Sequence, residues 1–145
     1  MLAYPVLKTV PIFGTKNSAN AIATTVTLAS TYTNTKTFTG GGNAQLVLFW
    51  KYTTGAAEAG TTLDIQMLGS NDNVNYYPTT NESAANGTST LFARTFAIAG
   101  GAGATAYPNS YRIDITYPWI KIQVAESGVN TNYGTLFMEA VLGGY

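Results

Sequence analysis

The sequence predicts an all-β fold, an antiparallel β-sandwich or jelly roll of about eight strands with an extended N-terminal arm. Apolar and polar residues alternate in several short runs, which is the period of a strand with one buried face. Clusters of Gly, Asn and Ser separate these runs at intervals of about 8 to 12 residues, as in sandwiches and barrels. No stretch combines a helical period of about 3.6 residues with caps at both ends, so we expect very little helix.

Residues 1–20 are apolar but are interrupted by Pro5, Pro11 and Gly14. Proline removes backbone donors and keeps a segment extended or at a sheet edge. The segment is therefore either an edge strand and loop over the domain's own core, or an arm laid over a neighbouring subunit. The arm interpretation divides the chain into an arm (1–20) and a β-sandwich domain (21–145), and predicts that a chain starting near Asn20 folds but loses assembly. It places these side chains in a subunit interface: Tyr4, Val6, Leu7, Val10, Ile12 and Phe13.

The next segment, from Ala21 to Thr39, is rich in threonine and predicts two strands joined near Ser30. The clearest alternation follows in two runs, Gln45–Tyr52 and Leu63–Gly69, which we expect to be central strands. Small residues and Asn/Asp from Gly69 to Asn75 predict a reversal that leads to a third strand. Further strands are expected at Thr88–Ile98, Tyr111–Ile115, Trp119–Ala125 and Thr135–Leu142.

The composition excludes several classes of function. The chain has 145 residues, enough for one domain, and hydrophobic residues make up 46% of them. Charged residues are only 10%, and seven Lys+Arg offset seven Asp+Glu, so we expect no binding to nucleic acid or to a membrane. A nearly uncharged surface favours self-association. The N-terminus lacks the pattern of a secretory signal, so export by that route is not expected.

Catalytic chemistry has few candidates, because the sequence contains no His and no Cys. The acids within predicted strands (Asp64, Asp114 and Glu139) fall on polar faces and form no evident pair. We therefore predict that the protein is not an enzyme and uses no cofactor. The Asn71–Asn75 loop could suggest calcium, but it lacks the glycine and the bidentate glutamate of a calcium loop. A turn stabilised by Asx side chains is the preferred interpretation.

Aromatic residues gather at predicted loops, and Tyr76, Tyr77 and Trp119 are the candidates for binding. Such rings can cap the ends of a β core, anchor a subunit interface or stack on a sugar. The sequence alone leaves these three possibilities open.

Two segments carry a family resemblance. Leu63–Pro78 resembles a hairpin of small tailed-phage structural proteins and discoidin-like jelly rolls, in which Gly-Ser-x-Asp-Gly-x-Asn ends a strand and an aromatic residue follows. Trp119–Ala140 looks like the partner strands of the same phage proteins. Asn73 replaces the usual glycine, which is tolerable because Asn also adopts left-handed geometry.

The resemblance implies a virion protein, most like a capsid decoration (cement) protein. Such a protein would be made in the host cytoplasm and would bind the major capsid protein on the capsid surface as a homo-oligomer, expected to be a trimer. No functional residue is transferred, because the family has no active site to carry over. The alternatives are a discoidin-like carbohydrate-binding module and a phage tail or neck component.

Overall fold

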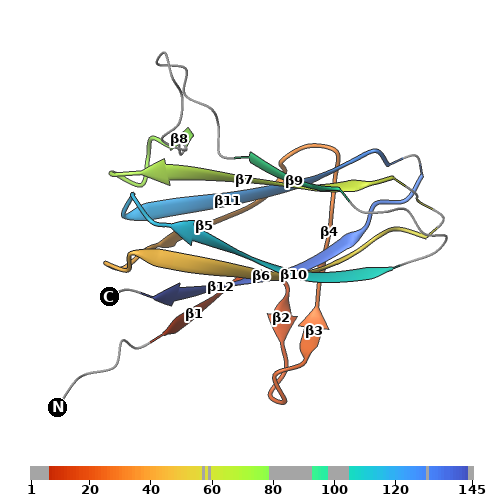
Figure 1. The fold of residues 1–145 in the computed structure, drawn as a ribbon, viewed down its shortest axis with the longest axis horizontal. Coiled ribbons are helices and arrows are strands. Elements are labelled where there is room, and N and C mark those ends of the chain that lie inside the picture. The colour runs from red at the N-terminus through yellow and green to blue at the C-terminus, as the bar shows by residue number, and fades with distance from the viewer. Residues whose placement is uncertain are drawn as a thin grey trace.

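The computed structural model describes residues 7–56, 58, 60–78, 93–97, 105–129 and 131–143, with 78 and 93–97 described in backbone only. Two antiparallel sheets pack face to face (Figure 1). The predicted antiparallel β-sandwich is confirmed, and the described residues contain no helix.

The first sheet has the strand order β1-β12-β6-β10. These strands are β1 (Lys8–Phe13), β12 (Thr135–Gly143), β6 (Gln45–Thr53) and β10 (Ala106–Asp114). The short β4 (Val26–Thr27) also pairs with β12, beyond the end of β1. A separate hairpin, β2 (Thr15–Lys16) with β3 (Ile22–Thr24), projects away from this sheet (Figure 1).

The second sheet has the order β5-β11-β7, followed by two short strands on the remaining edge of β7. Its strands are β5 (Asn34–Thr39), β11 (Trp119–Ser127), β7 (Thr62–Ser70), β8 (Tyr77–Pro78) and β9 (Ala93–Ala97). The two predicted central strands are thus β6 and β7, and each lies in the middle of a different sheet. Consecutive strands alternate between the sheets from β5 to β7, an arrangement compatible with a jelly roll.

The core lies between the sheets and follows the alternation read from the sequence. In β6, Leu46, Leu48 and Tyr52 are almost completely buried, while Phe49 points outward and is 43% exposed. The same period gives β7 and β11 one buried face each. The other buried core residues include Leu63, Ile65, Met67, Ile113, Ile120, Ile122, Val124, Leu136, Met138, Ala140 and Leu142.

The structure corrects the prediction for part of the N-terminal arm. Lys8–Phe13 forms β1, which pairs with β12, so the sandwich includes this strand and does not begin at residue 21. A register shift between Pro11 and Phe13 turns the adjacent Ile12 and Phe13 inward together, and each is only 6% exposed. These two side chains belong to the domain's own core and not to a surface that a neighbour could reach.

The remaining arm residues differ among themselves. Val10 is partly buried against the core, whereas Leu7 is 66% exposed. Tyr4 and Val6 lie outside the described residues, so their predicted contact with a neighbouring subunit stays a prediction.

Strand β10 is longer than the sequence predicted. The expected strand began at Tyr111, but the observed one begins at Ala106 and continues through Pro108. Proline is tolerated there because β10 is an edge strand of the first sheet, where fewer ladder donors are needed. Of the predicted strand Thr88–Ile98, residues 93–97 form β9 and the others lie outside the described residues.

Candidate functional site

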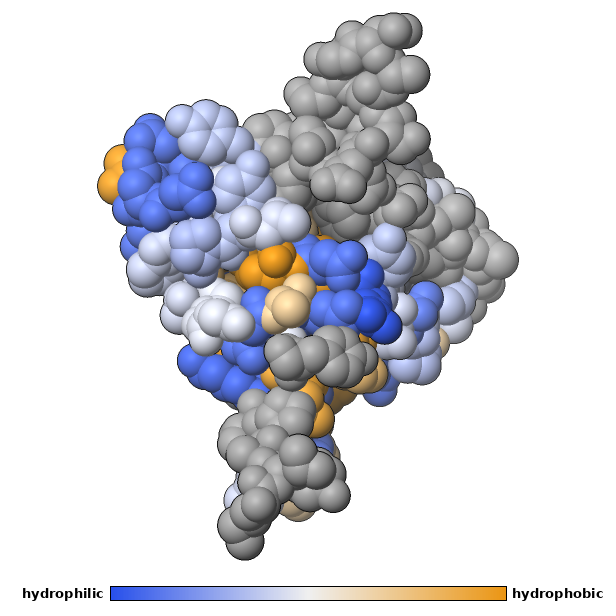
Figure 2. Space-filling model, turned by 60° about the vertical axis from the view of Figure 1, so that its left-hand side comes forward, coloured by the Kyte–Doolittle hydropathy of each residue, from blue (hydrophilic) through white to orange (hydrophobic). Residues whose placement is uncertain are grey.

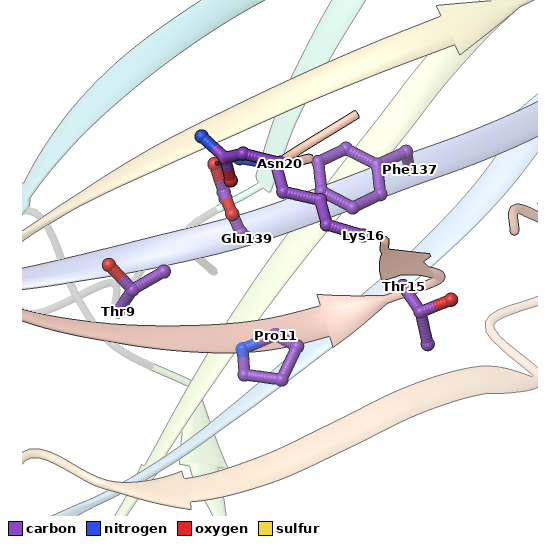
Figure 3. Close-up of a pocket in the computed structure, with 7 residues that line it drawn as sticks. All are labelled: Thr9, Pro11, Thr15, Lys16, Asn20, Phe137 and Glu139. Atoms are coloured by element: carbon purple, nitrogen blue, oxygen red, sulfur yellow. Dashed lines mark hydrogen bonds and ion pairs between the residues drawn. The ribbon is translucent and has the colours of Figure 1, made fainter. Parts of the chain in front are cut away.

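A groove lies between the β2–β3 hairpin and the outer face of the first sheet. It has a volume of about 620 Å³. Figure 3 shows Lys16 reaching from the hairpin toward Glu139 on β12, with Phe137 beside them. Its lining residues are Thr9, Pro11, Thr15, Lys16, Asn20, Phe137 and Glu139.

One ion pair and one aromatic ring join the hairpin to the sheet. The Lys16 Nζ lies 2.5 Å from Glu139 Oε1 and 5.5 Å from the centre of the Phe137 ring. The Phe137 side chain points outward, opposite the buried Met138, yet the residue is only 5% exposed. The pair is partly exposed, so solvent screens it and its contribution to stability is small. The ion pair thus links the hairpin to β12, above the Phe137 ring.

Local sequence explains why the chain leaves the sheet at this point. Gly14 has a φ of 77°, and a Cβ atom there would lie 2.2 Å from the Thr24 carbonyl oxygen. Only glycine fits this turn without moving the backbone. At the hairpin tip, the Asn17 Oδ1 accepts hydrogen bonds from the N–H groups of Ala19 and Ala21. The hairpin is therefore a defined element that stands away from the sheet.

The three candidate aromatic residues lie at one end of the second sheet, near the end of β7 where Ser70 pairs with Trp119. Tyr77 is 57% exposed, and Tyr76 and Trp119 are partly buried. The Lys121 Nζ lies 3.8 Å from the centre of the Tyr76 ring, so one face of that ring is already occupied. Figure 2, turned to bring the left-hand side of Figure 1 forward, shows orange residues near the middle of the face with hydrophilic residues around them. The arrangement offers less flat aromatic surface for a sugar than the sequence suggested.

The loop after β7 is closed by Asx hydrogen bonds, as predicted. The Asp72 Oδ1 accepts from the N–H groups of Val74 and Asn75 and from the Ser70 hydroxyl. Asn73 has a φ of 60°, the left-handed geometry expected where the family pattern has glycine. The backbone N–H groups of Asn75 and Val74, with the side-chain donors, hold the pKa of the Asp72 carboxyl well below its ordinary value. The carboxylate is thus engaged in stabilising the turn.

Replacing Asp72 with Asn should lower the melting temperature at pH 7. Because the pKa of Asp72 is lower in the folded protein, its stabilising effect is complete above the unfolded pKa of about 3.9 and is lost as the pH falls below that value. The difference in melting temperature between wild type and Asp72→Asn should therefore shrink below about pH 4. Asp114→Asn is the matched control, since the Asp114 carboxylate accepts a hydrogen bond from the Gln45 side chain and closes no turn. A difference in melting temperature between wild type and Asp72→Asn that stays constant from pH 7 to pH 2.5 would contradict this explanation.

Two buried glutamates lie at the opposite end of the sandwich, and sequence reasoning missed both. Glu126 is completely buried in β11, where it accepts hydrogen bonds from the Tyr52 hydroxyl and, at 2.6 Å, from the Gly134 N–H. Glu58 is 2% exposed, and its Oε1 accepts from the N–H groups of Thr131 and Asn132. The two carboxylates together hold the segment that leads into β12.

Burial is the main cause that raises the pKa of the Tyr52 phenol well above its ordinary value, and the hydrogen bond to Glu126 raises it further. The Tyr52 hydroxyl also lies 3.0 Å from the Thr61 hydroxyl. Every polar group named in this cluster has a hydrogen-bond partner, as buried polar groups in a structural network do.

The described part of the chain holds no cluster of three acidic residues of the kind that binds a metal ion. No helix in that part is long and apolar enough to cross a membrane.

Comparisons with known proteins give information on the fold only. No protein-family model matches the chain, and no curated protein matches it. Among solved structures, the chain is similar to part of the dimeric latent PorU of Porphyromonas gingivalis, with 13% sequence identity and a TM-score of 0.50. The match covers 98% of this chain and 13% of the PorU chain. At this identity the likeness shows the fold alone, an independent example of the same β architecture.

Proposed function

We propose that the chain is a structural subunit of a tailed-phage virion that decorates the outer capsid shell as a homo-oligomer. The most direct support comes from the outer face of the first sheet, which carries features that packing of the core does not require. Phe49 is 43% exposed on the outer face of the central strand β6, and the β2–β3 hairpin projects from the same sheet. A contiguous apolar patch on the outer face of a sheet favours a protein partner, and the half-buried pair Val47 and Val141 adjoins Phe49 there.

The composition and the family resemblance support the same proposal. The equal numbers of basic and acidic residues leave little long-range repulsion between copies. The Ser70–Asn75 turn has Asn73 in the left-handed region, the geometry implied by the hairpin pattern that phage structural proteins share with discoidin-like jelly rolls. The carbohydrate-binding alternative shares this turn but has less aromatic surface for a sugar, because the Lys121 Nζ lies over one face of the Tyr76 ring.

The proposal predicts that the purified chain is a trimer in light scattering over a range of concentrations. It also predicts that the chain cosediments with capsids assembled from the major capsid protein, whereas an unrelated β-sandwich protein of similar size does not. A stable hexamer would replace the capsid role with a tail or neck role. A monomer at every concentration that also fails to cosediment would overturn the proposal.

A further inference from the structure

The outer face of the first sheet has an apolar centre. Leu48 and Trp50 point into the core, so Phe49 between them points out to this face. The register places Phe49 beside Glu139 of β12 and Ser110 of β10.

Two valines extend the apolar centre along the sheet. Val47 and Val141 are a cross-strand pair, lie two residues from Phe49 and Glu139 respectively, and are both partly buried. Because residues two apart on a strand share a face, Val47, Phe49 and Val141 form one apolar strip.

Charges of both signs surround this strip. Lys51 follows Phe49 on the same face of β6, and Arg112 and Asp114 lie on the same face of β10. All three residues are exposed. The Lys16–Glu139 ion pair borders the strip on the side of the hairpin. An apolar centre with a charged rim is the usual anatomy of a protein interface.

The edges of the same sheet are poorly suited to pairing with another chain. Both edge strands contain a proline, Pro11 in β1 and Pro108 in β10. Each proline removes a donor that an added strand would need, a device that blocks edge-to-edge growth. A contact between copies that uses the first sheet is therefore directed to its face and not to its edges.

We infer that a second copy of this chain docks on the outer face of the first sheet, with Phe49 at the centre of the contact. The rim carries both signs and the chain has equal numbers of basic and acidic residues, so a second copy meets no net repulsion there, whereas a site for a nucleic acid or a strongly acidic partner would carry mainly one sign. The hairpin and its groove border the face, so they limit the direction from which the second copy approaches. This inference rests on the proposed function, because it names the surface through which the homo-oligomer forms.

The test compares Phe49→Asp with Val74→Asp. Val74 is also an exposed apolar residue, 76% exposed, but it lies in the loop after β7 on the second sheet. A central aromatic anchor of an interface is worth at least about a 30-fold change in affinity. In light scattering over a dilution series, Phe49→Asp should raise the dissociation constant by that factor or more, while Val74→Asp should assemble like wild type. Circular dichroism should show that both variants are folded, and Phe49→Ser replaces Phe49→Asp if the charged variant unfolds.

A labelling experiment gives an independent readout, since the chain has no cysteine of its own. A maleimide should react slowly with Ser110→Cys in the oligomer and rapidly with Val74→Cys. If wild type is an oligomer but Phe49 variants assemble normally and Ser110→Cys reacts rapidly, this interface is wrong and the proposed function stands. If wild type is a monomer at every concentration, this inference is wrong, and the proposed function is overturned with it only if the chain also fails to cosediment with capsids.

Discussion

Replacing Phe13 with alanine should lower the free energy of unfolding by about 3 to 5 kcal/mol, the usual cost of removing a buried phenylalanine. Phe13 is only 6% exposed and belongs to the hydrophobic core between the sheets. Its ring also helps to hold β1 onto β12, because the bulge in β1 turns it inward beside Ile12. Urea unfolding followed by tryptophan fluorescence would measure the loss.

Leu7 is the matched control for Phe13. It precedes the same strand but is 66% exposed, so Leu7→Ala should change the free energy of unfolding by less than about 0.5 kcal/mol. A loss below about 1 kcal/mol for Phe13→Ala would mean that β1 is not part of the cooperative core.

The position of β1 also changes the result expected from a chain that starts near Asn20. The arm interpretation predicted that this shorter chain would fold and lose assembly. Because the truncation removes β1, including the buried Ile12 and Phe13, we now expect it to be severely destabilised. A fair test of residues 1–6 as an arm must keep the chain from Leu7 onward.

Replacing Glu126 with alanine should cost about 3 kcal/mol or more, because it leaves a cavity and removes the acceptor of the buried Gly134 N–H. The Tyr52 hydroxyl also loses its bond to Glu126 and keeps the Thr61 hydroxyl as a partner. The expected result is a fall in the urea midpoint, with loss of order concentrated in the segment before β12. Hydrogen exchange at Gly134 would report that local loss directly.

Glu126→Gln is the control that keeps the volume of the side chain. The glutamine oxygen can accept from Gly134, and its amide can donate to Tyr52 once the Tyr52 hydroxyl donates to Thr61. The cost should therefore be nearer 1 kcal/mol. If Glu126→Gln lowers the free energy of unfolding as much as Glu126→Ala does, the carboxylate charge matters more than the hydrogen-bond pattern. If Glu126→Ala lowers it by less than about 1 kcal/mol, the network does not stabilise the fold.

Much of the fold could be predicted because one face of each long strand is buried. The alternation in Gln45–Tyr52 and Leu63–Gly69 identified β6 and β7, and the Asn/Asp cluster after Gly69 identified the turn that Asp72 closes. These features depend on neighbours in the chain, so sequence patterns record them.

The features that were missed depend on contacts between distant residues. Glu126 continues the buried series of Ile122 and Val124, and extending that strand by two residues would have revealed it. Glu58 has no such signal, since its partners Thr131 and Asn132 lie in another loop. The hairpin and its groove were also missed, because they depend on Lys16 meeting Glu139, a residue 123 positions away.

The pairing of β1 with β12 sets an order on folding during synthesis. Strand β1 hydrogen-bonds to β12, so it must wait until the chain has been synthesised through β12. The floor of the groove comes from both strands, and it therefore appears only after β12 has been made. Translation products that stop before β12 would lack this part of the surface and would be excluded from any assembly that uses it.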